Sequence, residues 1–157
     1  ADIDMIRSHK RPLKDGIDFG YVGDVDHANG NMLHTLIEAG IVPVMAPLTH
    51  DGNGNILNTN ADTIASETAK ALAPYYDVTL MFCFEKKGVL SNPDDDDSVI
   101  PSITPEEFKA LVADGTVAGG MIPKLENSFN AIEHGVKQVV ITLASSIDGK
   151  HGTILRG

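Results

Sequence analysis

The chain has 157 residues, of which 42% are hydrophobic and 22% charged, and its formal net charge is −10. This composition predicts a folded globular domain and excludes a disordered chain. The acidic balance excludes a basic surface for nonspecific nucleic-acid binding, although a small phosphorylated ligand needs only a lysine and a few oriented N–H groups. No apolar run reaches the roughly 18 residues of a membrane span, and the N-terminus lacks a signal-peptide pattern, so a cytoplasmic protein that binds no membrane is expected.

The first half of the chain alternates strand and helix signals. Residues 1–20 are polar and basic, with proline and glycine as breakers, and are predicted to form a hairpin arm. A short β-type run over 21–25 precedes a helix over 29–39, which Gly40 closes. The almost continuous apolar run 41–48 predicts a strand of a parallel sheet covered on both faces.

The second half continues the alternation. The sequence Thr104-Pro105-Glu106-Glu107 combines an N-cap, a proline at the first helical position and a glutamate that closes a capping box. The only cysteine, Cys83, lies in an apolar run, which predicts a buried thiol. The expected elements are helices over 61–72, 105–113 and 122–134, buried strands over 78–84 and 138–143, and a closing edge strand over 152–155. This order predicts the α/β class, as a three-layer αβα sandwich with a mainly parallel central sheet.

The first candidate site motif is a cluster of polar side chains at the start of the helix over 61–72. Asn58 and Asn60 fall on the same side of an extended chain, and Asp62 falls in the first helical turn. Two amides suit a small carboxylate or amide ligand, and the aspartate suits a cationic side chain. The alternative is structural, with Asn60 as an N-cap and Asp62 as a charge favoured by the helix dipole.

The second motif is Ala118-Gly119-Gly120-Met121-Ile122-Pro123-Lys124, at the start of the helix over 122–134. Glycines permit close approach of a ligand to the backbone, and free N–H groups with a nearby lysine form a cradle for phosphate. The alternative is a tight loop followed by a solvated lysine. In an α/β sheet both motifs lie at carboxyl ends of strands, where ligands usually bind.

Four segments together resemble the amino acid kinase superfamily, and within it the acetylglutamate kinases. They are Gly20-Tyr21-Val22-Gly23-Asp24-Val25, Asn58-Thr59-Asn60-Ala61-Asp62-Thr63-Ile64-Ala65, Gly119-Gly120-Met121-Ile122-Pro123-Lys124 and Gly152-Thr153-Ile154-Leu155. The resemblance implies phosphorylation of the γ-carboxylate of N-acetylglutamate or N-succinylglutamate by ATP with Mg²⁺, as in arginine biosynthesis, by a homodimer or higher homo-oligomer.

The resemblance also implies residue roles. Asn58 and Asn60 would bind the acylglutamate, Asp62 would orient the catalytic lysines, and Lys124 would stabilise the transferring phosphoryl group. Residues 21–73 would then belong to the end of the acylglutamate-binding lobe, and residues 74–157 to the nucleotide-binding lobe. The nucleotide-binding residues expected on this basis are Gly119, Gly120, Met121, Lys87 and Gly88.

The sequence departs from the family pattern in two places. The N-terminal glycine loops and the first catalytic lysine of the family have no match, so the chain is interpreted as the C-terminal portion of a kinase domain. Residues 84–90 stand where relatives usually carry a Thr-Asp or Ser-Asp pair. The acidic run 94–97 is interpreted as a solvated loop, with cation binding as the alternative, and the scattered histidines predict no metal site. Alternative functions are a noncatalytic nucleotide-binding or oligomerisation module, or a carbamate, uridylate or aspartate kinase.

Overall fold

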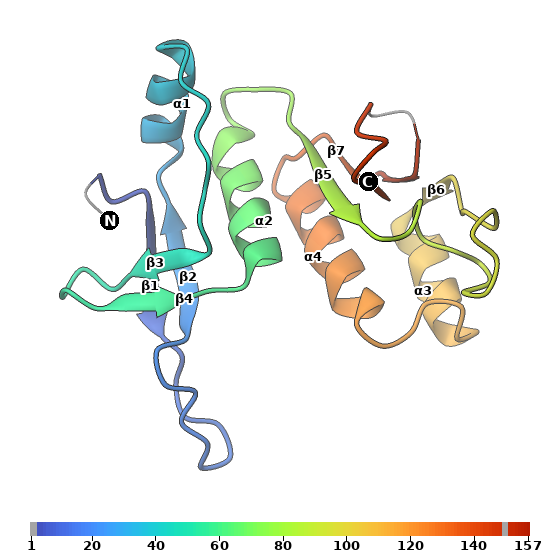
Figure 1. Ribbon diagram of the computed structural model, residues 1–157, viewed down its shortest axis with the longest axis horizontal. Helices are drawn as coiled ribbons and strands as arrows, with labels where there is room; N and C mark the ends of the chain where they lie inside the picture. Colours follow the sequence, from blue (N-terminus) through green and yellow to red (C-terminus); the bar gives the residue numbers. More distant parts are fainter. Residues whose placement is uncertain (1–2, 149–150) are drawn as a thin grey trace. The chain divides into compact units, whose positions relative to one another are not determined.

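The computed structural model describes residues 3–148 and 151–157, which divide into two compact units, Ala1–Tyr76 and Asp77–Gly157 (Figure 1). In the described residues each unit holds a four-stranded sheet and two helices. The predicted α/β class is therefore confirmed. The strands do not form one mainly parallel sheet, because each unit builds its own mixed sheet from parallel and antiparallel pairs. The unit boundary follows Tyr76, close to the predicted lobe boundary after residue 73, and the lobe roles stay predictions.

The first unit is built on a hairpin. Its strands β1 and β2 pair antiparallel, and the loop between them reaches residue 22. Strand β1 also pairs in parallel with β3, which pairs antiparallel with β4, so the strand order is β2-β1-β3-β4. The elements of this unit are β1 (Ile6–Lys10), β2 (Gly23–Ala28), α1 (Gly30–Glu38), β3 (Leu48–His50), β4 (Ile56–Asn58) and α2 (Ala61–Leu72).

Both helices of the first unit begin at an asparagine cap. The side chain of Asn29 accepts a hydrogen bond from the Met32 N–H, and that of Asn60 accepts one from the Thr63 N–H. Such caps satisfy backbone donors that have no partner inside the helix. Helix α2 packs against α1 and β2. The core of this unit consists of Met5, Ile6, Ala28, Leu33 and Ile64.

The prediction of a buried strand over 41–48 is wrong. Residues 41–46 form no strand, and β3 begins only at Leu48. Val42 and Val44 are 84% and 92% exposed. Prolines at positions 43 and 47 have no backbone N–H to donate to a neighbouring strand. Apolar composition alone does not make a strand, which also requires a partner that accepts and donates its backbone hydrogen bonds.

The second unit contains β5 (Thr79–Phe84), β6 (Ser102–Ile103), α3 (Pro105–Ala113), α4 (Met121–Glu133), β7 (Gln138–Leu143) and β8 (Thr153–Leu155). The strand order is β5-β7-β8-β6. Strand β5 is parallel to β7, and β8 is antiparallel to β7 and parallel to β6. The predicted edge strand at 152–155 therefore occupies an interior position, between β7 and β6.

The core of the second unit lies between its sheet and its helices. Val139, Val140 and Ile141 of β7 are almost completely buried, as expected for a strand with neighbours on both sides. Helix α4 packs on β7, and the Phe108 and Phe129 rings, 5.5 Å apart, join α3 to α4. The predicted capping box at the start of α3 is present.

Cys83 is exposed, which corrects the prediction of a buried thiol. Strand β5 lies at an edge of its sheet, so its side chains meet fewer neighbours than those of β7. The adjacent Phe82 points the other way and is buried. In the described part of the chain, no helix is long and apolar enough to cross a membrane.

Candidate functional site

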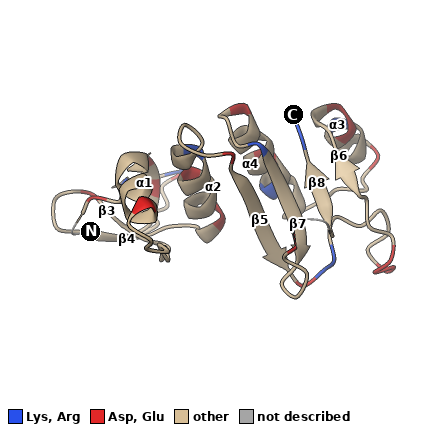
Figure 2. Ribbon diagram, turned by 90° about the horizontal axis from the view of Figure 1, so that it is seen from above, with Lys and Arg blue, Asp and Glu red and all other residues tan. Residues whose placement is uncertain are grey.

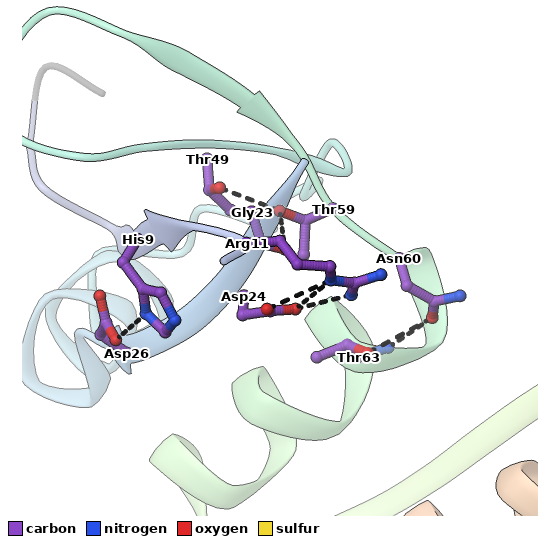
Figure 3. Close-up of polar contacts among 9 residues, drawn as sticks. All are labelled: His9, Arg11, Gly23, Asp24, Asp26, Thr49, Thr59, Asn60 and Thr63. Atoms are coloured by element: carbon purple, nitrogen blue, oxygen red, sulfur yellow. Dashed lines mark hydrogen bonds and ion pairs between the residues drawn. The ribbon is translucent and has the colours of Figure 1, made fainter. Parts of the chain in front are cut away.

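The polar motif of the first unit lies at the junction of β4 and α2 (Figure 3). Asn58 and Asn60 are exposed, whereas Thr59 between them is buried, so the two amides share the solvent side of the chain. The Asn60 side chain caps α2, with a distance of 3.0 Å from the Thr63 N to its Oδ1. Asp62 is half-buried in the first turn of α2. The structural reading of Asn60 is thus confirmed, and the binding role of its remaining amide donors stays a prediction.

Buried hydroxyl groups hold this junction against β2. Thr59 Oγ1 lies 3.0 Å from Thr49 Oγ1 and donates to the Gly23 carbonyl at 3.3 Å. A Cβ atom on Gly23 would lie only 2.8 Å from the Leu57 Cβ. Glycine at this position therefore lets β2 approach β4 closely. The exposed amides on either side of Thr59 are fixed by a buried anchor.

A charged pair beside this junction was not among the predicted site residues. Arg11 donates from Nη2 to Asp24 Oδ1 at 2.6 Å and from Nε at 3.1 Å (Figure 3). The hydrogen bond from Arg11 lowers the pKa of the Asp24 carboxyl, and the same bond raises the pKa of the guanidinium. The sequence signal for this pair is one basic and one acidic residue on the two arms of a hairpin, Arg11 directly after β1 and Asp24 within β2. That signal identifies a contact only when the register of the hairpin is known.

The glycine-rich motif of the second unit forms a turn before α4. Gly119 has a φ of +57°, whereas Gly120 has an ordinary φ of −67° and precedes the first helical residue. A Cβ atom added at either glycine would meet no atom within 4 Å. Among the described residues, no backbone hydrogen bond uses the N–H of Gly119 or Gly120. These donors, at the positive end of the helix dipole, suit an anion such as phosphate.

Lys124 lies in the first turn of α4 and contacts an aromatic ring. Its Nζ is 3.8 Å from the centroid of the Phe84 ring. Phe84 is the last residue of β5, so the contact joins the carboxyl end of that strand to the start of α4. Phe84 is not among the predicted site residues, because nothing local in the sequence indicates that its ring faces Lys124.

A pocket of about 980 Å³ opens in the second unit beside these elements. Its walls come from the end of β5, the following loop, and the segment between α3 and α4, with Met121 at the start of α4. This volume is within the range of small-molecule sites. Of the predicted nucleotide-binding residues, Met121 and Gly88 line the pocket. Gly88 also has a packing role, because a Cβ there would lie 2.7 Å from Thr153 Oγ1.

Two lysines of the loop between β5 and β6 pair with the acidic run 94–97 of the same loop (Figure 2), and the first of them, Lys86, also lines the pocket. Lys86 Nζ lies 2.6 Å from Asp96 Oδ1, and Lys87 Nζ lies 2.6 Å from Asp97 Oδ1. The hydrogen bonds raise the pKa of both lysines. The Lys87 ammonium, a predicted nucleotide contact, is thus paired with a carboxylate. Within residues 3–148 and 151–157, no group of three or more His, Cys, Asp or Glu side chains has the arrangement of a metal site.

The predicted site residues are divided between the two units. Asn58, Asn60 and Asp62 gather at the β4–α2 junction of the first unit. The two glycines and Lys124 gather at the start of α4 in the second. Because Asp62 and Lys124 belong to different units, the expected common cleft for the two motifs stays a prediction.

Known proteins resemble this chain in sequence, in fold or in both. An acetylglutamate kinase of Phocaeicola vulgatus is 67% identical over 156 residues, which cover 99% of this chain and 60% of the relative. The solved structure of smu.665 from Streptococcus mutans UA159 is 31% identical, with a TM-score of 0.75, covering 97% of this chain and 56% of that one. N-acetylglutamate synthase from Neisseria gonorrhoeae, complexed with coenzyme A and N-acetyl-glutamate, has a TM-score of 0.84 at 20% identity, over 98% of this chain and 37% of that one.

The three relatives differ in what they establish. The synthase shows a common fold alone, whereas the kinase of P. vulgatus matches in sequence almost throughout this chain. The chain spans 60% of that kinase's length. The sequence model described as the amino acid kinase family matches residues 1–143, a range that contains three of the four segments quoted above and both site motifs. The resemblance inferred from those segments is confirmed, and the chain belongs to the amino acid kinase family.

Proposed function

We propose that the protein containing this chain transfers the γ-phosphoryl group of ATP to the γ-carboxylate of N-acetylglutamate or another N-acylglutamate. The observation that carries the proposal is the start of α4. Ala118 and Met121, on either side of the two glycines, line the pocket of the second unit, and the Lys124 ammonium contacts the ring of Phe84, which also lines it. The name and 67% identity of the P. vulgatus acetylglutamate kinase support the choice of acylglutamate as acceptor.

The proposed reaction needs charge neutralisation more than covalent help. An oxygen of the γ-carboxylate attacks the γ-phosphorus, a new P–O bond forms, and the bond from that phosphorus to the bridging oxygen breaks to release ADP. Charge on the equatorial oxygens is stabilised by the ammonium of Lys124 and by oriented N–H groups. A carboxylate with a pKa of about 4 is already ionised at neutral pH, so no general base is required. Asn58 and Asn60 are proposed to hold the acylglutamate, and the role implied for Asp62 stays a prediction.

ATP is proposed to enter the pocket of the second unit, with its phosphates toward the turn at Gly119 and Gly120. Apolar side chains such as Val89 and Leu90 line this pocket and suit the base. Magnesium usually keeps several waters and binds one or two carboxylates together with substrate phosphates. Glu85 and Asp114 are the carboxylates of the pocket wall, so these residues fit the ion without a dedicated cage. Bound there, Mg²⁺ would neutralise phosphate charge.

The proposal is tested on the complete gene product. The acyl phosphate formed with ATP, Mg²⁺ and N-acetylglutamate is trapped with hydroxylamine and measured as the hydroxamate. N-succinylglutamate and aspartate are assayed in the same way, carbamate and UMP are assayed in parallel by the release of ADP, and N-acetylglutamine, which has no γ-carboxylate, is the negative control. Removing the Lys124 ammonium in Lys124→Ala is expected to lower kcat by about 10²- to 10³-fold, the usual cost of losing one donor to a transition-state anion.

The outcomes separate the candidate functions. Phosphorylation of an N-acylglutamate alone supports the proposal and identifies the acyl group. Turnover of carbamate, UMP or aspartate instead assigns another branch of the family. ATP binding in a calorimeter without transfer to any acceptor assigns a noncatalytic nucleotide-binding module. Near-normal kcat in Lys124→Ala contradicts the role of that lysine.

The proposal extends to a cytoplasmic homodimer or higher homo-oligomer. The support for assembly is the family resemblance, together with exposed apolar side chains such as Val42 and Val44 in the first unit. Light scattering on the complete gene product measures the mass directly. A monomer at the concentration of the kinetic assay would contradict this part of the proposal and leave the chemistry untouched.

A further inference from the structure

Lys124 is held by an aromatic side chain at the carboxyl end of β5. The distance of 3.8 Å from its Nζ to the Phe84 ring centroid is well inside the roughly 6 Å range of cation–π contacts. A lysine side chain has a flexible stem of four carbons, so its ammonium can occupy many positions around the start of a helix. The uncharged ring restricts the positions that the ammonium can occupy on one side.

The Phe84 ring is itself fixed by its strand. Phe84 pairs with Leu143 in the parallel ladder between β5 and β7, so its backbone is set by the sheet. Its ring stacks near that of Phe82, with centroids 6.2 Å apart and an angle of 19° between the planes. Phe82 lies two residues earlier on the same face and is only 6% exposed. The contact to Lys124 therefore starts from a rigid base.

The geometry points to Phe84 as a positioning residue, whose ring places the Lys124 ammonium for phosphoryl transfer at the rim of the pocket that Phe84 also lines. This inference rests on the proposed kinase function. Phe84 acts through Lys124 and need not touch the reacting atoms. Losing the ring face should thus reduce kcat, while KM for the acylglutamate, which Asn58 and Asn60 are proposed to bind, changes little.

The test compares Phe84→Leu and Phe84→Tyr in the complete gene product. Leucine keeps apolar bulk and removes the ring, and is expected to lower kcat by about five- to tenfold, the rate equivalent of one cation–π contact. Tyrosine keeps the ring face and should stay within about twofold of the parent by the same reasoning. Phe82→Leu is the matched control: it removes the supporting ring of the same strand and keeps the Phe84 face itself, so its kcat loss should be smaller than that of Phe84→Leu.

A double variant distinguishes positioning from general damage. In the Lys124→Met background, Phe84→Leu should cause no further loss, because the group that the ring positions is already absent. A further loss there, an unchanged kcat in Phe84→Leu, or an equal kcat loss in Phe82→Leu with the thermal midpoint retained overturns the inference. A parent enzyme that phosphorylates no N-acylglutamate overturns the proposed function and the positioning role with it.

A spectroscopic measurement covers the case in which Phe84→Leu does not fold. Lysines of the parent protein are reductively methylated with ¹³C, and the Lys124 resonance is assigned by its loss in Lys124→Arg. An ammonium above a ring face experiences an upfield ring-current shift, which Phe84→Tyr should retain. A Lys124 resonance at the position of solvent-exposed lysines would show that the contact does not exist and would overturn the inference.

Discussion

Arg11 and Asp24 join the end of β1 to the start of β2 through a forked ion pair, with 2.6 Å between Nη2 and Oδ1. The Arg11 N–H also donates to the Val22 carbonyl, so the backbone and the side chain fix the same register. This pair holds β2 beside the β4–α2 junction, to which Gly23 and Thr59 already connect it.

Asp24→Asn is expected to destabilise the protein by about 0.5–1 kcal/mol at pH 7, a modest value because both side chains are more than a third exposed and solvent screens the pair. The hydrogen bond from Arg11 lowers the pKa of Asp24 in the folded state. The contribution is therefore present above the unfolded value of about 4 and is lost as the pH falls through the folded pKa. Urea unfolding of parent and variant at several pH values measures both effects, and equal stability at pH 7 contradicts the assignment.

Asn60 offers a way to separate a cap from a ligand contact. Asn60→Ala should cost about 1 kcal/mol, because the Thr63 N–H loses its acceptor. Asn60→Asp keeps that acceptor and should unfold near the parent midpoint, while repulsion of the acylglutamate carboxylates raises KM. Asn58→Ala, which removes no cap, is the control for stability. An Asn60→Asp enzyme with parental KM would limit Asn60 to its structural role.

Gly23→Ala tests the close approach of β2 to β4. The added Cβ would lie 2.8 Å from the Leu57 Cβ and 3.1 Å from the Oγ1 atoms of Thr49 and Thr59. Such overpacking is expected to cost about 1–3 kcal/mol. Urea unfolding of parent and variant measures this cost. The nearby Gly20 is unsuitable as a control position, because its φ of +69° would strain an alanine whatever space surrounds it. An unchanged free energy of unfolding in Gly23→Ala would show that β2 and β4 can move apart at this position without loss of stability.

Gly120→Ala tests the proposed seat of the phosphates. Because Gly120 has a φ of −67° and open space at the Cβ position, stability should change by less than about 1 kcal/mol. Affinity for ATP, measured by calorimetry, should fall at least several-fold if phosphate packs against this backbone. Gly119→Ala is strained by a φ of +57° and should lose stability as well. Unchanged ATP affinity in Gly120→Ala would show that the phosphates of ATP do not bind against this turn.

Cys83 reports on occupancy of the pocket. Its thiol is exposed and lines the pocket of the second unit, so it should react with a chromogenic disulfide reagent in the folded protein. ATP should slow this reaction if it fills the same pocket. Cys83→Ser is the blank for any other cysteine of the complete gene product. A rate that is independent of ATP would place the nucleotide outside this pocket.

Local signals predicted the fold best. The bounds of α2, α3 and β7 are predicted by caps and by apolar periodicity, signals that lie within or next to each element. The structure has these bounds as predicted. The run 41–48 and Cys83 failed because burial depends on which segments become neighbours. An apolar run with two prolines forms no strand here, and an edge strand exposes a cysteine that an interior strand would cover.

The candidate site divides in the same way. The glycines at 119 and 120 and the Asn60 cap are motifs within one segment, and the sequence places them at helix starts. Phe84 meets Lys124 only because α4 packs on the sheet that contains β5, and Arg11 meets Asp24 only through the pairing of β1 with β2. Sequence periodicity carries no information on such pairings.

The interior position of β8 has a consequence for biosynthesis. Among the described residues, the short strand β6 has β8 as its strand neighbour, although many residues separate the two in the chain. On the ribosome, β5 and β7 can pair as soon as both have emerged, whereas β6 must wait until residues 153–155 leave the exit tunnel. Nascent chains stalled before that point should keep residues 102–103 accessible to protease, so completion of this sheet is a late event in translation.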